Sequence, residues 1–289
     1  MKLIATDMDG TLLNKHNEIS EENVRAIQKA KEHGIEVVVA TGRAYESALD
    51  RLQAAGLQCP VICLNGAEIR SEEGAIVKSI PLNNETYKKI QRICQREDLY
   101  FEVFTNQGTY AVDRERSIQV MVDIIATANP HFEEAEARKY AEERLVLENF
   151  SFIESYEELL SMEGLKIYKV LAFSFDEEQL NYIRGQLKGE PELAITSSAR
   201  DNLEFNHKDA QKGLALKAFA EQRGIKMEDV MALGDNFNDA SMLQMAGRGV
   251  AMGNAEEEIK KLCRYVTKTN NDHGVAYAIE EMLQEKIGI

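Results

Sequence analysis

The sequence predicts an α/β fold: a doubly wound parallel (Rossmann-like) core sheet with an inserted α+β domain. Short apolar segments alternate with helical patterns over residues 1–81, and the same alternation returns over 207–289. Between them, residues 82–206 mix hairpin and helix patterns, which is typical of a separate α+β layer. The length of 289 residues also favours about two domains. We therefore assign 1–81 and 207–289 to one core domain and 82–206 to an insertion.

In the first part of the core, apolar runs predict strands and one-sided apolar patterns predict helices. Ser20 can cap a helix that Gly34 ends. The run from Val37 to Ala40 is wholly apolar, as expected of a strand that is buried on both faces. In chain order, the expected elements are a strand at 2–6, a helix after Ser20, a strand at 35–40, a helix that includes 45–52 and a strand at 61–64.

The insertion and the second part of the core follow from the same patterns. Asn106-Gln107-Gly108 is a turn signal between two strand-like segments. The insertion is expected to contain a helix that includes 87–94, strands at 100–105 and 109–112, helical sequence over 116–148, a strand at 166–175, a helix at 177–187, and strands at 193–198 and 202–205. The core is then expected to resume with a helix at 209–223, a strand at 230–233, a helix through 245, strands at 249–252 and 265–267, and a helix at 274–285.

The composition narrows the range of functions. Lys and Arg number 34 and Asp and Glu number 49, and the resulting net charge of −15 disfavours nucleic acid and anionic lipid as partners. No apolar run approaches the roughly 20 residues of a membrane helix, and no signal peptide is evident, so we expect a cytoplasmic protein. The cysteines and histidines lack zinc-ligand spacing. No obligate protein partner is indicated.

Polar residues follow the expected core strands at their carboxyl ends, where open α/β sheets bind ligands. The first strand ends in Asp7-Met8-Asp9-Gly10-Thr11. The second and third end in Thr41-Gly42-Arg43 and Asn65-Gly66. The strand after the insertion ends in Gly234-Asp235-Asn236-Phe237-Asn238-Asp239, and Lys212 stands near the start of the helix before it. We expect these side chains to converge on one edge of the sheet.

Such a group of carboxylates restricts the chemistry of the edge. Carboxylates within a few ångströms repel each other, and Mg²⁺ removes the repulsion because it prefers carboxylate, water and phosphate oxygens. Thr41, Lys212, Asn238 and free backbone N–H groups suit the remaining oxygens of a phosphate. A carboxylate can be a covalent nucleophile, and a second one two residues on can act as general acid and then general base. The edge therefore suits a small phosphorylated metabolite despite the acidic surface.

These motifs resemble those of the haloacid dehalogenase-like phosphatases. Asp7-Met8-Asp9-Gly10-Thr11 matches the D-x-D-G-T signature of that family, and Thr41, Lys212 and the segment 234–239 match its other three motifs in order. Together with Asn65-Gly66-Ala67, the pattern looks most like the Cof-type branch of sugar-phosphate phosphatases. The resemblance covers the whole chain and implies that the insertion is a cap domain that determines substrate specificity.

The resemblance also implies roles for individual residues. Asp7 would attack phosphorus and become an aspartyl phosphate, and Asp9 would protonate the leaving alcohol and then deprotonate water. The Mg²⁺ ligands would be the carboxylates of Asp7 and Asp235 and the backbone carbonyl of Asp9. Asp239 would support the metal either as a further ligand or through residues that bind it. The phosphoryl group would be held by the N–H of Met8, Thr41, Gly42, Lys212 and Asn238. Arg43 and Asn65 would face the substrate.

Three alternatives remain open from the sequence. A phosphotransferase or phosphohexomutase on the same core would pass the phosphoryl group to a sugar hydroxyl instead of water. A hydrolase of a phosphorylated cofactor, such as flavin mononucleotide or pyridoxal phosphate, would share every motif. A receiver-like phosphate switch also uses an acidic pair, a Thr and a Lys, but its phosphoacceptor follows a strand in the middle of a small single domain. Here Asp7 follows the first strand, which favours an enzyme.

Overall fold

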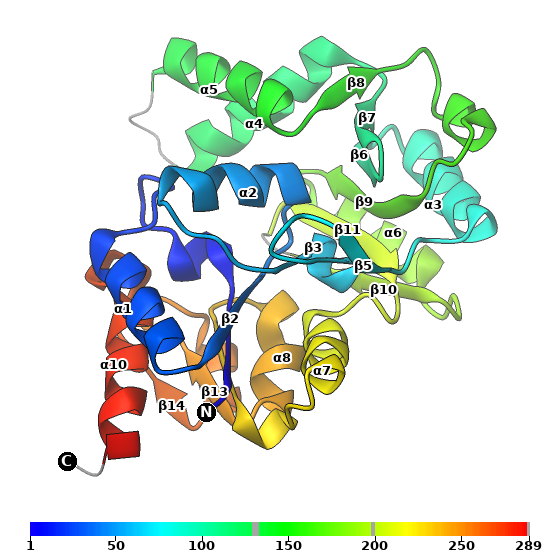
Figure 1. Cartoon of the computed structure of the whole chain (residues 1–289). Coiled ribbons are helices and arrows are strands. Elements are labelled where there is room, and N and C mark those ends of the chain that lie inside the picture. Colours follow the sequence, from blue (N-terminus) through cyan, green and yellow to red (C-terminus); the bar gives the residue numbers. More distant parts are fainter. Residues whose placement is uncertain (129–132, 198–199, 288–289) are drawn as a thin grey trace. The chain divides into compact units, whose positions relative to one another are not determined.

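Two β-sheets, each with its own helices, organise the chain (Figure 1). The computed structural model describes residues 1–128, 133–197 and 200–287. Residues 1–80 and 209–289 form unit 1, and residues 81–208 form unit 2. Unit 1 therefore joins the two ends of the chain, and unit 2 is the continuous segment between them.

Unit 1 contains an eight-stranded sheet in the order β14-β13-β12-β1-β2-β3-β4-β5. The strands are β1 (Leu3–Thr6), β2 (Glu36–Ala40), β3 (Val61–Cys63), β4 (Glu68–Arg70), β5 (Ile76–Ser79), β12 (Val230–Gly234), β13 (Arg248–Ala251) and β14 (Tyr265–Val266). The pairs from β14 to β3 are parallel, and β4 and β5 add antiparallel pairs. The predicted α/β class with a parallel core sheet is confirmed.

Helices cover both faces of this sheet (Figure 1). They are α1 (Glu21–Glu32), α2 (Tyr45–Ala54), α7 (Lys212–Gln222), α8 (Ala240–Met245), α9 (Glu257–Leu262) and α10 (Gly274–Ile287). The pair α1 and α10 packs together, and so does the pair α7 and α8. Ser20 caps α1 as predicted, because its side chain accepts a hydrogen bond from the N–H of Asn23.

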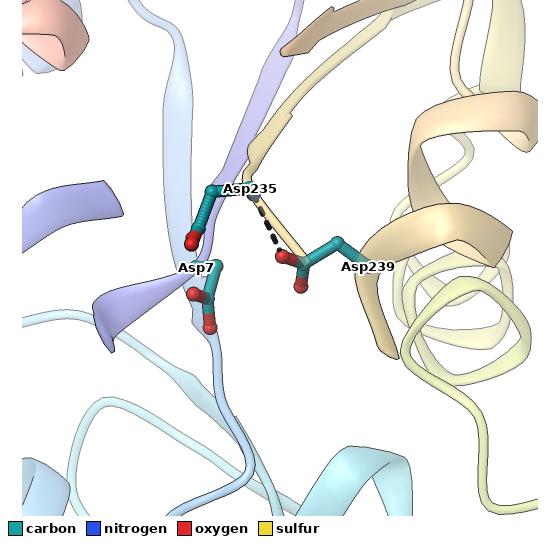
Figure 2. A group of neighbouring side chains, drawn as sticks. All are labelled: Asp7, Asp235 and Asp239. Carbon is teal, nitrogen blue, oxygen red and sulfur yellow. Dashed lines mark hydrogen bonds between the residues drawn. The ribbon is translucent and has the colours of Figure 1, made fainter. Parts of the chain in front are cut away.

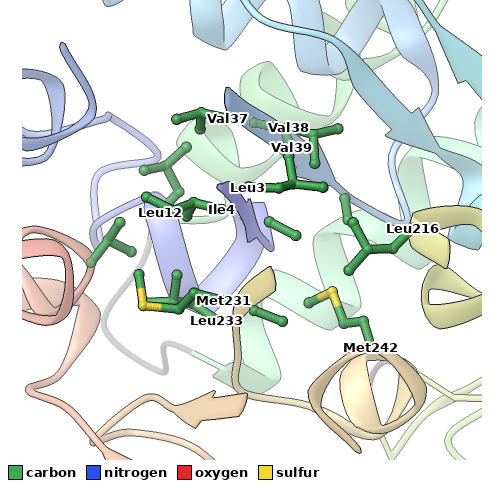
Figure 3. Packing of buried hydrophobic residues seen from close by; sticks show 14 of the residues in the cluster. Leu3, Ile4, Leu12, Val37, Val38, Val39, Leu216, Met231, Leu233 and Met242 are labelled. Atoms are coloured by element: carbon green, nitrogen blue, oxygen red, sulfur yellow. The ribbon is translucent and has the colours of Figure 1, made fainter. Parts of the chain in front are cut away.

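The centre of the sheet is apolar on both faces (Figure 3). Ile4 in β1 and Val38 in β2 are fully buried, as are Leu216 from α7 and Met242 from α8. Consecutive rather than alternating burial is what a parallel strand covered by helices on both sides requires. Polar side chains are consequently concentrated where the strands end, and this placement forms the candidate site.

One difference from the prediction lies at the edge of this sheet. The expected parallel strands stop at residue 64, whereas the structure continues with the hairpin of β4 and β5. Each strand has only three or four residues, and the side chains of Ile76 and Val77 are exposed. Such short, half-exposed strands lack the apolar alternation that predicts a strand. The connecting turn contains Gly74, whose φ of +86° is disfavoured for other residues.

Unit 2 is an α+β layer with a six-stranded sheet in the order β10-β11-β9-β6-β7-β8. The strands are β6 (Tyr100–Thr105), β7 (Gly108–Ala111), β8 (Phe150–Phe152), β9 (Ile167–Phe173), β10 (Leu193–Thr196) and β11 (Asn202–His207). All pairs are antiparallel except β7 with β8. The helices are α3 (Asn84–Arg96), α4 (Arg114–Ala128), α5 (Glu134–Leu147) and α6 (Glu177–Leu187).

The structure refines three expectations for unit 2. The helical sequence expected at 116–148 forms two helices, α4 and α5, and residues 129–132 between them lie outside the described part. Strand β8 was not expected, because three residues are too few to show a period. The strand expected at 193–198 ends at Thr196, and residue 198 is outside the described residues. None of the helices in the described ranges has the length and hydropathy that a membrane-spanning segment needs.

Candidate active site

The site begins where β1 and β12 end side by side. The two strands are parallel and in register, so Asp7 after β1 and Asp235 after β12 emerge at the same edge. The N–H of Asp7 donates to the carbonyl of Leu233 at 2.9 Å. Gly10 has φ +73°, and a Cβ there would lie 2.3 Å from Oδ2 of Asp235. Glycine is therefore required at residue 10, both for its backbone conformation and for the close approach of Asp235.

Three carboxylates meet at this edge (Figure 2). Asp7, Asp235 and Asp239 each place one carboxylate oxygen within 4.8 Å of the other two. Oδ2 of Asp239 accepts hydrogen bonds from the N–H groups of Asp235 (2.9 Å) and Asn236 (3.1 Å). Thr11 donates from Oγ1 to Oδ1 of Asp235 at 2.7 Å. The backbone and Thr11 therefore hold the acidic side chains in fixed positions.

Lys212, the first residue of α7, joins two of these acids. Its Nζ donates to Oδ1 of Asp7 and to Oδ1 of Asp239, both at 2.6 Å, and its side chain is fully buried. Close packing of α7 on α8 places it there, since a Cβ on Gly213 would lie 2.5 Å from the backbone of Ser241. One cation is thus shared between two buried carboxylates.

The charged side chains of the three acids and Lys212 shift one another's pKa values. Burial, and then the charge of Asp239, raise the pKa of Asp7 well above its usual range, although Lys212 opposes the shift. The same two causes raise the pKa of Asp235 to about 6, with Thr11 opposing. Burial would lower the pKa of Lys212, but the carboxylates of Asp239 and Asp7 outweigh it and the pKa is raised. These shifts show that the three acids, when all are ionised, carry more negative charge than Lys212 balances.

The donor set fits a hard divalent cation. Carboxylate oxygens are the ligands that Mg²⁺ prefers, and its charge would balance the remaining acids. Hydrogen bonds among the described residues use both oxygens of Asp239 but only Oδ1 of Asp7 and of Asp235. Oδ2 of Asp7 and Oδ2 of Asp235 would therefore be available to such a cation. Both oxygens of Asp239 are already used, one by Lys212 and the other by the backbone N–H groups of residues 235 and 236.

Asp9 stands outside the carboxylate cluster. Arg43 donates to both of its oxygens, from Nε at 2.8 Å and from Nη2 at 2.6 Å. A further donation from Nη1 to Oγ of Ser47, at 3.1 Å, orients the guanidinium group. The side chain of Asp9 remains 52% exposed, so it can still reach a ligand. The sequence predicted Arg43 as a residue that faces the substrate; the structure adds a bidentate contact to Asp9.

Asn238 and Gly42, expected to hold the phosphoryl group, lie close to Asn65, which was expected to face the substrate. Asn238 donates from Nδ2 to Oδ1 of Asn65 at 3.2 Å, and a Cβ on Gly42 would lie 3.0 Å from the same Oδ1. Thr41, which precedes Gly42, is fully buried and its N–H donates to the carbonyl of Ile62. The side chain of Met8 is also fully buried, so only its backbone can serve a ligand.

Tight turns bring the end of β3 to the start of α7. Asn65 has φ +58°, a conformation that Asn tolerates better than most residues. Gly66 follows with φ +100°, and a Cβ there would lie 2.7 Å from the carbonyl of Gln211, the residue before Lys212. The order Asn65-Gly66 therefore matters for the site, because a larger residue at 66 would push away the segment that carries Lys212.

Sequence reasoning missed two supporting side chains. Thr11 was quoted as part of a motif without a role, and it proves to hold Asp235. Ser47, which binds Arg43, lies four residues after it at the start of α2. The spacing of four residues between Arg43 and Ser47 is the feature of the sequence that could have predicted this contact. The same spacing is common on helices, so it does not identify a contact by itself.

Buried acids and a lysine at the ligand edge of a doubly wound sheet are typical of an α/β enzyme. The haloacid dehalogenase-like hydrolase family matches residues 4–279. The chain belongs to this family, and the resemblance predicted from its motifs is confirmed.

Individual relatives cover almost the whole chain. Phosphatase YwpJ of Bacillus subtilis (strain 168) is 39% identical over 98% of this chain and 100% of its own. The 5-amino-6-(5-phospho-D-ribitylamino)uracil phosphatase YwtE of the same organism is 36% identical, over 98% of both chains. A haloacid dehalogenase-like hydrolase from B. subtilis has a solved structure that is 38% identical, with a TM-score of 0.89 over 98% of this chain and 100% of that one. The predicted phosphatase class is confirmed.

We predict that Lys212→Met destabilises the metal-free protein. Near pH 7 the free energy of unfolding should fall by about 3–5 kcal/mol, because the substitution leaves Asp7 and Asp239 buried without their counter-charge. Denaturant titration in EDTA measures this. Adding Asp239→Asn to Lys212→Met should restore part of the loss, since one uncompensated charge is removed. Equal stability of Lys212→Met and wild type would contradict the charge balance described above.

Proposed function

We propose that this protein is a Mg²⁺-dependent phosphatase that hydrolyses small phosphorylated metabolites, with sugar phosphates as the favoured class, through an aspartyl phosphate on Asp7. The observation that supports this most is the position of Asp7. Its carboxylate touches Lys212, lies within the group of three acids and is followed two residues later by the half-exposed acid Asp9. The proposed nucleophile and proton carrier are thereby close together in the chain, and the counter-charge from α7 lies against the nucleophile.

In the first half-reaction, an oxygen of Asp7 forms a bond to phosphorus and the bond from phosphorus to the substrate oxygen breaks. Asp9 supplies the proton that the departing alcohol needs. In the second, Asp9 takes a proton from water, the water oxygen bonds to phosphorus, and the bond to Asp7 breaks to release inorganic phosphate. Mg²⁺, when bound by Asp7, the carbonyl of Asp9 and Asp235, would supply positive charge at the phosphoryl oxygens.

The other site residues have roles in holding the phosphoryl group. Lys212 offers positive charge beside Asp7. Thr41, Gly42 and Asn238 are proposed to offer hydrogen-bond donors to the phosphoryl oxygens. The contacts of Arg43 imply a further step in the reaction, because Asp9 accepts two hydrogen bonds from Arg43. That pair has to loosen before Asp9 can pass a proton. Arg43 and Asn65 are proposed to meet the substrate at that stage.

Unit 2 is proposed to act as the cap that selects the leaving group. One face of its sheet is apolar and packs on α3 and α6 through residues such as Phe101, Val170 and Phe205. The alternate positions are mixed: they include Phe104 and Leu171 as well as Lys169 and Glu204. Lys169 and Glu204 form a buried ion pair at 3.3 Å, and Lys169 lies over the ring of Phe104 at 4.5 Å. The polar groups among these positions are proposed to supply the hydrogen bonds that a hydroxyl-rich leaving group needs.

The names of relatives support a phosphorylated metabolite as the substrate but do not identify which metabolite it is. YwtE is named for a phosphorylated ribitylaminouracil, and a relative from Escherichia coli (strain K12), 28% identical over 96% of this chain and 97% of its own, is named pyridoxal phosphate phosphatase YbhA. These names differ in the leaving group and share the phosphate ester. We therefore include phosphorylated cofactors among the substrates to be tested.

We predict Mg²⁺-dependent phosphate release from a panel of sugar phosphates, flavin mononucleotide and pyridoxal phosphate. EDTA should abolish it, and Asp7→Asn should reduce turnover at least about a thousandfold, because no covalent intermediate can form. Phosphate release by colorimetric assay measures this, with Asp229→Asn, an acid that pairs with Lys2, as the control. Retained turnover in Asp7→Asn would refute the mechanism. An isomerised sugar phosphate without free phosphate would show a mutase instead.

We predict that Mg²⁺ stabilises the folded protein even without substrate. Binding of a ligand at about 100 times its Kd adds roughly 2.7 kcal/mol, so the thermal midpoint should rise on addition of MgCl₂. Asp235→Asn should reduce the rise, because it removes a proposed ligand charge, whereas Asp229→Asn should not. Thermal melting with and without MgCl₂ measures this. No shift in wild type would contradict the cation site.

We predict that Glu204→Gln changes substrate preference without removing the chemistry. The kcat/KM for the best sugar phosphate should fall about tenfold, since a charged hydrogen-bond acceptor is lost. Hydrolysis of 4-nitrophenyl phosphate should stay within about threefold of wild type. Glu178→Gln, an exposed acid on α6, is the matched control. An unchanged ranking of substrates in Glu204→Gln would contradict the assignment of this face.

A further inference from the structure

Two asparagines from the C-terminal part of unit 1 hold the turn that carries Asp9. Asn254 donates from Nδ2 to the carbonyl of Gly10 at 2.8 Å, and Asn270 donates from Nδ2 to the carbonyl of Leu13, also at 2.8 Å. Neither residue belongs to the four motifs that the sequence analysis singled out. Both contacts are made to backbone atoms, so they act on the shape of the turn.

The orientation of the Asn254 amide is itself fixed. Its Oδ1 accepts a hydrogen bond from the N–H of Asn270 at 2.9 Å. That contact places the oxygen on one side, so the NH₂ group faces Gly10. Asn271 extends the same arrangement, because its Oδ1 accepts from the N–H of Lys15. Three successive points of the loop after β1 are therefore tied to the segment 254–271.

The turn has a conformation that needs such support. Within the turn Met8–Leu12, Asp9 (φ −75°, ψ 125°) and Gly10 (φ 73°, ψ −1°) depart from helical angles. Its internal hydrogen bonds run from Leu12 and Leu13 to the carbonyls of Asp7 and Met8. The carbonyl of Gly10, directly after Asp9, is instead held by Asn254.

The segment that carries Asn254 also touches the acid on the other strand. The N–H of Glu256 donates to the carbonyl of Asp235 at 3.3 Å. The short stretch 254–256 thus contacts the backbone beside the proposed acid–base residue and the backbone of a proposed metal ligand.

We propose that Asn254, oriented by Asn270, is a positioning residue that places Asp9 for proton transfer to the leaving group; this inference rests on the function proposed above. A misplacement of about 1 Å can cost a hundredfold in rate. The loss of activity should be greatest for substrates whose leaving group needs a proton. A sugar hydroxyl leaves only with a proton, whereas 4-nitrophenolate leaves without one, so the two substrates separate the role of Asp9 from general damage.

The test compares Asn254→Ala with Asp9→Asn on the preferred sugar phosphate and on 4-nitrophenyl phosphate. For Asn254→Ala we expect kcat/KM to fall about tenfold or more on the sugar phosphate and less than about threefold on 4-nitrophenyl phosphate. Asp9→Asn should show the same selectivity with a larger loss. Asn254→Asp keeps the shape and the acceptor for Asn270 but removes the donor, and it serves as the second variant if Asn254→Ala does not fold.

Asn106 in unit 2 is a close structural match for the control. It is exposed, its Nδ2 donates to the carbonyl of Gly164 at 3.1 Å, and its Oδ1 accepts from the N–H of Lys166 at 2.7 Å. Asn106→Ala should leave both substrates unaffected. The inference is overturned if Asn254 variants lose activity equally on both substrates, lose none, or behave like Asn106→Ala while Asp9→Asn remains selective. If Asp9→Asn shows no selectivity, the acid role of Asp9 fails, and the inference fails with it.

Discussion

The excess of negative charge at the end of β1 is the constraint on which the rest of unit 1 depends. Asp7 and Asp239 are buried and share the single ammonium group of Lys212, with Asp235 beside them. Buried carboxylates remain charged only when cations or hydrogen bonds compensate them. Glycines at 10 and 234 allow the approach, since a Cβ on either would lie within 3 Å of an acid side chain. A site so charged is suited to a cation and a phosphate.

Much of this arrangement could be predicted from the sequence, because it depends on local order. Apolar runs followed at once by Asp7, Thr41 or Asp235 place polar residues at strand ends, and parallel pairing then brings them together. The ion pair between Arg43 and Asp9 could not be predicted in this way. It joins residues 34 positions apart through the conformation of two loops, and loop conformation depends on tertiary contacts that no periodicity records.

The two units divide the work in the proposed function. Unit 1 provides the acids and the lysine, whose spacing leaves little freedom, since glycines and buried charges surround them. In unit 2, one face of the sheet packs on α3 and α6, and the buried Lys169–Glu204 pair lies among the alternate positions, which can vary without disturbing that packing. This separation agrees with the relatives YwtE and YbhA, which are both named phosphatases but are named for different substrates.

The C-terminal segment shows that a site can depend on residues that carry no charge. Residues 254–271 bind the loop after β1 at Gly10, Leu13 and Lys15 through asparagine side chains. Asparagine suits this task because one amide offers both a donor and an acceptor, so it can be oriented by one backbone group while it holds another. An acid there would bring further negative charge close to the carboxylate cluster. The neutral amide therefore fixes the shape of the turn without altering the charge balance that the site requires.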